Sequence, residues 1–276
     1  MLCVTYAGKT SHDCRFKDVS FRTLRKGQRR NMDNRFATAL VIGSVLSLLS
    51  VIYLSTAVGT VSWYHYFTPS VLSNLSEAAA ADFLSETDEK VYTDALFRCN
   101  GSLGLWQMCI RVPQHNLEQQ HESPSVSKCI LLSFSDQFLD KYQDPGNHNT
   151  ETDLVRTYLW RCQFLLPLVA LGLIFFGAVV GLAGCVCRSL YPALGTGALH
   201  LLAGVCTLGS VLCFSSGVQM LQERLPLPHG VRGEYGWSFC LACVSSPLQV
   251  MAGALFLWAA RASRREYTLM KAYRVA

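Results

Sequence analysis

Cysteine and histidine are the residues of this sequence whose types and spacing could carry chemistry. Cys240 and Cys243 form a CxxC pair, which is the spacing of redox-active and metal-binding thiols. Both lie inside a long apolar run, where thiols behave as small hydrophobic groups. His200 also lies in such a run, without a second His or a carboxylate to complete a metal site, so it is typical of a hydrogen-bonded packing residue. We therefore predict no catalytic residue, no metal, no cofactor and no small-molecule substrate.

Three other cysteines lie in one polar stretch between the first two apolar runs. They are Cys99, Cys109 and Cys129. In an oxidising compartment two of them would form a disulfide and one thiol would be left over. Three pairings are possible, and Cys162, at the edge of the next apolar run, is a weaker fourth candidate.

Four apolar runs are the elements that position these groups. They cover residues 36–58, 163–187, 193–218 and 237–260, and none contains Asp, Glu, Lys or Arg. As a helix, the 23-residue first run would reach about 34 Å, which is enough to cross a bilayer. Pumps, transporters and intramembrane proteases need ionisable groups or nucleophiles at depth, so the uncharged runs argue against those functions.

The charges divide according to the loops between these runs. Lys and Arg outnumber Asp and Glu by 9 to 3 in residues 1–35 and by 5 to 1 in residues 261–276, with one more Arg at 188. The loop 59–162 carries 7 basic and 13 acidic residues, and the loop 219–236 carries 2 of each. By the positive-inside rule both termini are cytosolic and both larger loops lie outside the cytosol. The net charge of +5 is therefore no sign of a nucleic-acid partner.

The domain organisation follows from these spans. We predict a cytosolic basic segment over residues 1–35, of which 1–31 is a disordered extension, then a four-span domain over 36–260 and a cytosolic tail over 261–276. Membrane lipid is the first partner. Four tryptophans lie at span ends, where indole rings favour the head-group level: Trp63, Trp160, Trp237 and Trp258.

The loop 59–162 has strand-like pieces of its own. They are Trp63–Thr68, Ala95–Cys99, Ser102–Val112 and Cys129–Phe134. Asn100-Gly101 suits a tight type I′ turn between the second and third pieces. We therefore predict a small antiparallel sheet that rests on the helix bundle.

Short motifs also predict modifications and sorting. They are the N-glycosylation acceptors Asn74 and Asn100, the palmitoylation candidates Cys185 and Cys187, and a tyrosine-based sorting motif at Tyr267 and Met270. Both sequons fall in the loop that the charges place outside the cytosol, and the paired cysteines end a span at the cytosolic interface.

The first loop resembles the signature of the claudin and peripheral-myelin-protein superfamily. The matching residues are Trp63, Gly104-Leu105-Trp106, Cys109 and Cys129, with Arg161 at the mouth of the second span. The resemblance lies within residues 32–276. It implies an α-helical membrane protein, a left-handed four-helix bundle topped by an extracellular antiparallel sheet. It also implies a bridge between the two signature cysteines, with the Trp and Gly-Leu-Trp residues anchoring the sheet.

The resemblance further implies a non-enzymatic plasma-membrane protein at cell–cell contacts. It would act in adhesion or tight-junction-like barrier regulation, with itself, other superfamily members or junction proteins as partners. The stretches from Trp63 to Gly104 and from Cys109 to Cys129 are longer than in strand-forming claudins, which favours barrier regulation over pore formation. The alternative is an auxiliary or trafficking subunit of an ion channel or receptor.

Overall fold

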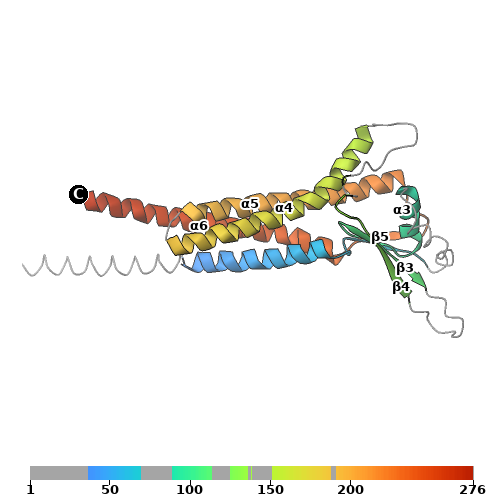
Figure 1. The fold of residues 1–276 in the computed structure, drawn as a ribbon, viewed down its shortest axis with the longest axis horizontal. Helices are drawn as coiled ribbons and strands as arrows, with labels where there is room; N and C mark the ends of the chain where they lie inside the picture. The colour runs from blue at the N-terminus through green and yellow to red at the C-terminus, as the bar shows by residue number, and fades with distance from the viewer. Residues whose placement is uncertain are drawn as a thin grey trace, which may run out of the picture.

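Four long helices form the body of the protein, with a sheet at one end and the C-terminus at the other (Figure 1). The computed structural model describes residues 37–69, 89–113, 125–135, 138, 151–187 and 191–275. Four helices are long and apolar enough to cross a membrane, which confirms the predicted spans. They are Ala37–Gly59 (the first helix), Leu154–Leu182 in α4 (Glu151–Cys187), Pro192–Arg224 in α5 (Tyr191–Arg224) and Trp237–Ala262 in α6 (Trp237–Val275).

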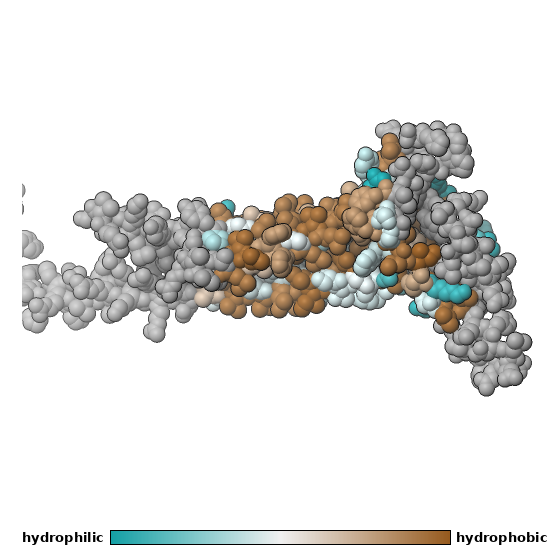
Figure 2. Space-filling model, in the orientation of Figure 1, coloured by the Kyte–Doolittle hydropathy of each residue, from teal (hydrophilic) through white to brown (hydrophobic). Residues whose placement is uncertain are grey.

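The bundle turns apolar side chains outward and keeps polar ones inside. Figure 2 shows the apolar band along the helices on the face in view. Inside, Thr207 donates to Gln249 Oε1 at 3.0 Å, and Gln249 Nε2 donates to Ser245 Oγ at 2.9 Å. Ser245 Oγ then donates to the Ser50 carbonyl at 3.0 Å, so one chain of hydrogen bonds joins three helices. Such bonds help to hold helices together in lipid, where no hydrophobic force drives helices to associate.

His200 belongs to this internal packing. Its Nδ1 lies 2.8 Å from the Thr196 carbonyl, which can only accept, so Nδ1 carries the proton. Nε2 must then accept from the Ser47 hydroxyl at 2.7 Å. The ring also lies close to Gly177, where a Cβ atom would come within 3.1 Å of it. His200 is therefore a hydrogen-bonded packing residue in the structure, as we predicted.

A proline shapes the sheet-side end of α4. This helix bends away from the bundle toward its N-terminal end (Figure 1), and Pro167 lies inside it. Proline has no N–H, so the carbonyl of Gln163 loses its usual donor one turn later. Ser210 of α5 replaces that donor with its hydroxyl, at 2.9 Å.

The predicted antiparallel sheet is present and has five strands in the order β4-β3-β2-β1-β5. Their bounds are Tyr64–Phe67 for β1, Ser102–Leu103 for β2, Gln107–Pro113 for β3, Ser125–Leu131 for β4 and Arg232–Tyr235 for β5. β5 was not predicted: it comes from the loop before α6 and pairs with β1. Tyr64 and Tyr66 of β1 point into the core between sheet and helices, whereas Phe67 is exposed.

Two sequence predictions for this sheet are wrong. Ala95–Cys99 is not a strand, because it lies mostly in the helix α3 (Glu89–Arg98). Asn100 has a φ of 47° and Gly101 N–H donates to the Leu96 carbonyl at 2.9 Å, which is a helix C-terminal cap and not a hairpin turn. The predicted strand Ser102–Val112 is also divided, into β2 and β3. Residues 1–36 lie outside the described residues, and so does Asn74.

Candidate functional site: the signature residues and the sheet they hold

Two signature tryptophans bind the end of the first helix. The last carbonyls of a helix lack intrahelical donors. Trp63 Nε1 donates to the Ala57 carbonyl at 2.7 Å and Trp106 Nε1 donates to the Val58 carbonyl at 2.8 Å. Thr60 Oγ1 donates to the carbonyl four residues earlier, at 2.8 Å. Three consecutive carbonyls that lack a donor within the helix thus each accept a hydrogen bond, and two of the donors come from the sheet region.

Trp63 does not face the lipid head groups as an interfacial tryptophan would. Its side chain is fully buried (0% exposed) between the sheet and the bundle. The indole packs at centroid distances of 4.9 Å from Phe214 and 5.9 Å from Phe239. The chain turns back over the helix end directly before β1, so the ring is enclosed instead of facing lipid. Trp237 and Trp258, each 51% exposed, keep the surface positions expected of interfacial tryptophans.

The Gly-Leu-Trp tripeptide forms the tip of the β2–β3 hairpin. Gly104 N–H donates to the Gln107 carbonyl at 2.9 Å and so closes a turn with Leu105 and Trp106 at its centre. Leu105 is 1% exposed. A Cβ atom at Gly104 would lie 2.9 Å from the Val61 Cα, so only glycine lets the hairpin approach the end of the first helix this closely.

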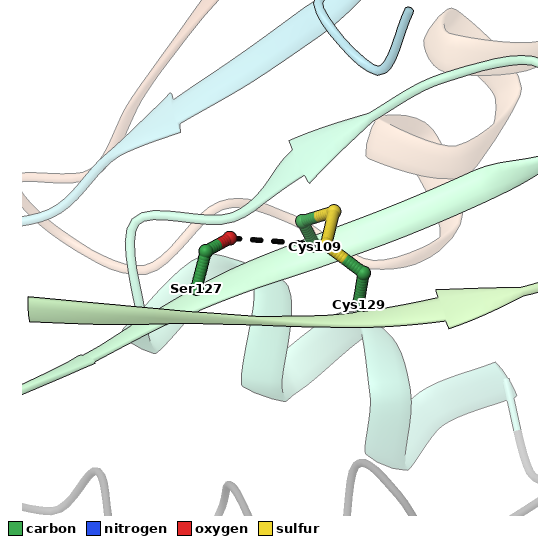
Figure 3. Close-up of a disulfide and its surroundings, with 3 residues drawn as sticks. All are labelled: Cys109, Ser127 and Cys129. Carbon is green, nitrogen blue, oxygen red and sulfur yellow. Dashed lines mark hydrogen bonds between the residues drawn. A yellow bond between two sulfur atoms is a disulfide. The ribbon is translucent and has the colours of Figure 1, made fainter.

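The structure contains the disulfide between Cys109 and Cys129 that the resemblance implies. These cysteines are direct partners in the β3–β4 register, with a Cα–Cα distance of 4.0 Å (Figure 3). On β4, the Ser127 hydroxyl lies 3.7 Å from the Cys129 sulfur. Cys99 is the thiol left over: it is free and buried, and burial raises its pKa. Cys162 is also free.

Arg161 lies where α4 approaches the sheet side. Its guanidinium donates to the Phe138 carbonyl at 3.0 Å and lies 5.9 Å from the centroid of the Phe138 ring. The side chain thus ties α4 to the segment that follows β4. This geometry supports a positioning role.

A family model described as PMP-22/EMP/MP20/claudin tight junction matches residues 48–258, more than half of the chain. The chain belongs to the PMP-22/EMP/MP20/claudin family. The four spans and the sheet between the first two agree with a claudin-like fold. Claudin-family membership points to a non-enzymatic structural membrane protein.

Among the described residues of this claudin-family protein, no group of three or more His, Cys, Asp or Glu could hold a metal ion. Cys240 and Cys243 are both free thiols on α6. The tryptophans of the signature hydrogen-bond the sheet region to the end of the first helix.

The predicted modification sites differ in how far the structure describes them. Asn100 Oδ1 accepts from the Thr68 N–H at 2.7 Å, so this sequon residue also ties α3 to β1. Cys185 and Cys187 end α4, and Tyr267 and Met270 fall within α6, with only the backbone described. Glycosylation, palmitoylation and sorting remain predictions.

β4 is the outermost strand at one side of the sheet and pairs only with β3 among the described strands. A Cα–Cα distance of 4.0 Å marks Cys109–Cys129 as a non-hydrogen-bonded pair. By strand periodicity Ser127, Cys129 and Leu131 therefore point their N–H and C=O groups away from β3. All three side chains are exposed. Sequence reasoning missed this edge because it depends on which residues pair across the sheet.

Proposed function

We propose that this claudin-family protein acts in cell–cell contact and barrier regulation at the plasma membrane. It does so by associating with a second copy of itself, or with related junction proteins, through the sheet. The observation that carries the proposal is the edge of β4, held on a membrane-spanning bundle by the signature residues.

An open strand edge is a template for another strand, because its unpaired N–H groups can donate to, and its unpaired C=O groups can accept from, the main chain of a partner. Apolar side chains along and near this edge add contact area. Val126 and Leu131 are exposed on β4.

The charges support placing the sheet outside the cell. The loop that supplies β1 to β4 is acidic, whereas the segments beyond the other end of the bundle are strongly basic. Under the positive-inside rule the sheet then faces a neighbouring cell and both termini face the cytosol.

Ser127→Pro tests the edge directly. Its N–H points away from β3, so proline removes an edge donor and leaves the β3–β4 ladder intact. Ser127→Ala keeps the N–H and is the matched control. In cells that express tagged full-length protein, we expect wild type and Ser127→Ala to concentrate at contacts between two expressing cells, and Ser127→Pro to lose that enrichment.

Equal enrichment of Ser127→Pro at contacts would refute the edge as the interaction surface. A barrier role further requires that knockdown in an epithelial monolayer changes solute flux or junction morphology. Stable co-purification of a single ion channel or receptor, without enrichment at contacts, would favour the auxiliary-subunit alternative.

A further inference from the structure

A cavity of about 50 Å³ lies where the sheet and α3 meet the sheet-side ends of α4 and α5. Most of its described lining is apolar, including Trp160 of α4 and Phe214 of α5. The polar side chains among the lining are Thr93, Arg156 and Gln163. α4 bends away from the bundle toward its N-terminal end (Figure 1), and Arg156, Trp160 and Gln163 of this helix line the cavity.

The three polar side chains are buried, which is unusual for such groups. Arg156 is 6% exposed, Gln163 is 4% exposed and Thr93 is 0% exposed. The Thr93 hydroxyl has no hydrogen-bond partner among the described residues. Burial of a hydroxyl without a partner costs free energy that a bound acceptor would offset.

The chemistry of the lining selects a kind of occupant. No acidic side chain is among the described residues that line the cavity, and Arg156 is the charged one. Arginine, threonine and the glutamine amide can all donate hydrogen bonds. An oxyanion with several acceptor atoms therefore fits this lining, because charge-assisted bonds from a guanidinium are the strongest of this kind.

The level of the cavity relative to the membrane indicates where such an oxyanion comes from. Trp237, at the start of α6, is half exposed and marks the head-group level. Phe239, two residues on, packs 6.0 Å from the Phe214 ring that lines the cavity. From Phe214 the lining rises along α5 to Leu221, which is about 10 Å at 1.5 Å per residue. The cavity therefore lies at the depth of lipid head groups.

We propose that this cavity binds the phosphate of a phospholipid from the leaflet on the sheet side. Arg156 is the charged donor to the phosphate, and Thr93 and Gln163 are neutral donors. An engineered cavity of about 150 Å³ holds a benzene ring, so this smaller one has room for a head-group oxyanion and none for an acyl chain. The site is independent of the β4 edge.

Native mass spectrometry of the full-length protein in a non-ionic detergent, titrated with phosphatidylglycerol, tests the site. We expect one saturable lipid adduct. Thr93→Val keeps the shape and removes one hydrogen bond to the phosphate oxyanion, so affinity should fall about tenfold. Arg156→Gln should weaken binding by about tenfold or more, because a charge-assisted bond is lost.

A glycine pair supplies a steric test with its own control. An added Cβ at Gly217, which lines the cavity, would meet Gln163 Oε1 at an ordinary 3.6 Å. Gly217→Val should therefore fill the cavity and abolish the saturable adduct. Gly172 of α4 has nothing within 4 Å of an added Cβ, so Gly172→Val should bind lipid as wild type does.

Unchanged lipid affinity in Gly217→Val or in Thr93→Val overturns the proposal. If Gly217→Val does not fold, as judged by its thermal melt, the isosteric Thr93→Val decides alone. Inorganic phosphate is the second probe: saturable retention of free phosphate with no phospholipid adduct overturns the lipid assignment. These outcomes are independent of enrichment at cell contacts, so failure here leaves the proposed function standing.

Discussion

The residues that mark this family act on backbone groups. Trp63 and Trp106 donate to the carbonyls of Ala57 and Val58 at the end of the first helix. Gly104 permits the contact that brings Trp106 there. Where the sheet buries the end of this helix, as at Ala57, a protein donor must take the place of water at the carbonyl. The two indole N–H groups are therefore needed as donors at the end of the first helix, and the glycine is needed to let the hairpin reach it.

Asn100 combines a structural and a predicted chemical role, which substitutions can separate. Its positive φ ends α3, its Oδ1 accepts from the Thr68 N–H, and it heads a sequon. We expect Asn100→Asp, Asn100→Gln and Ser102→Ala all to abolish the glycan shift on gels after glycosidase treatment. Only Asn100→Gln should also lose about 1 kcal/mol of stability, because Gln neither favours the left-handed region nor keeps the short acceptor.

Equal melting temperatures for the three variants would contradict the capping role of Asn100. Glycosidase-treated wild type serves as the reference, so that the loss of the glycan and the loss of the cap are measured apart.

His65 on β1 should make the sheet sensitive to acid. Burial, and secondarily the positive charge of Arg111, lower the pKa of His65 below its ordinary value. The folded state therefore favours the neutral ring, and its stabilising effect is complete above the unfolded pKa of about 6.5 and is lost as pH falls below it. We expect a lower melting temperature at pH 5.5 than at pH 7.5, with a smaller difference in His65→Gln. The same pH dependence in both proteins would contradict this role.

At the scale of elements, the helices could be predicted and part of the sheet could not. A span needs only a long uncharged apolar run, which is a local property of the sequence. Asn100-Gly101 is ambiguous because a type I′ turn and a helix C-terminal cap both require a positive φ. Leu96 and Phe97 are buried on α3, and Asp94 forms an ion pair with Arg98 one turn later, which is the helical signal that could have decided the matter.

β5 shows a different limit of sequence reasoning. Its four residues, Arg232–Tyr235, are polar, contain a glycine and are largely exposed, so they carry no alternating apolar pattern. The strand exists because Tyr64 to Phe67 of β1 pair with it across more than 160 positions of sequence. The burial of Trp63 depends on the same long-range contacts, which is why its position at a span end was misleading.

At the Gln163 carbonyl in α4, the Ser210 hydroxyl replaces the N–H that Pro167 lacks. A double-mutant cycle can measure this replacement. Ser210→Ala should cost about 1–2 kcal/mol, because the buried Gln163 carbonyl next to Pro167 is left without a donor. In a Pro167→Ala background the restored N–H supplies that bond, so the same substitution should cost much less. Unfolding in denaturant would give both values. Equal costs in the two backgrounds would show that Ser210 does not compensate for the proline.

At the scale of the whole molecule, charge and structure divide along the same axis. The five strands and α3 lie at one end of the bundle and the C-terminal part of α6 extends beyond the other end (Figure 1). The loop that builds most of the sheet is acidic, and the tail after Ala260 is basic. Translocation is resisted by Lys and Arg near a span, so this distribution predicts the orientation of the entire bundle.

Epitope insertion tests that orientation in living cells. The turn before β5 carries the exposed residues His229 and Gly230, and exposed loop tips tolerate insertions. We expect a tag placed after His229 to bind antibody on intact cells, and tags at either terminus to bind only after permeabilisation. Replacement of Arg261, Arg264 and Arg265 by Gln removes most of the basic charge of the tail and should leave a fraction of molecules with the C-terminal tag exposed. A terminal tag that is accessible on intact cells in the unaltered protein would reverse the assignment, and with it the claim that the β4 edge faces a neighbouring cell.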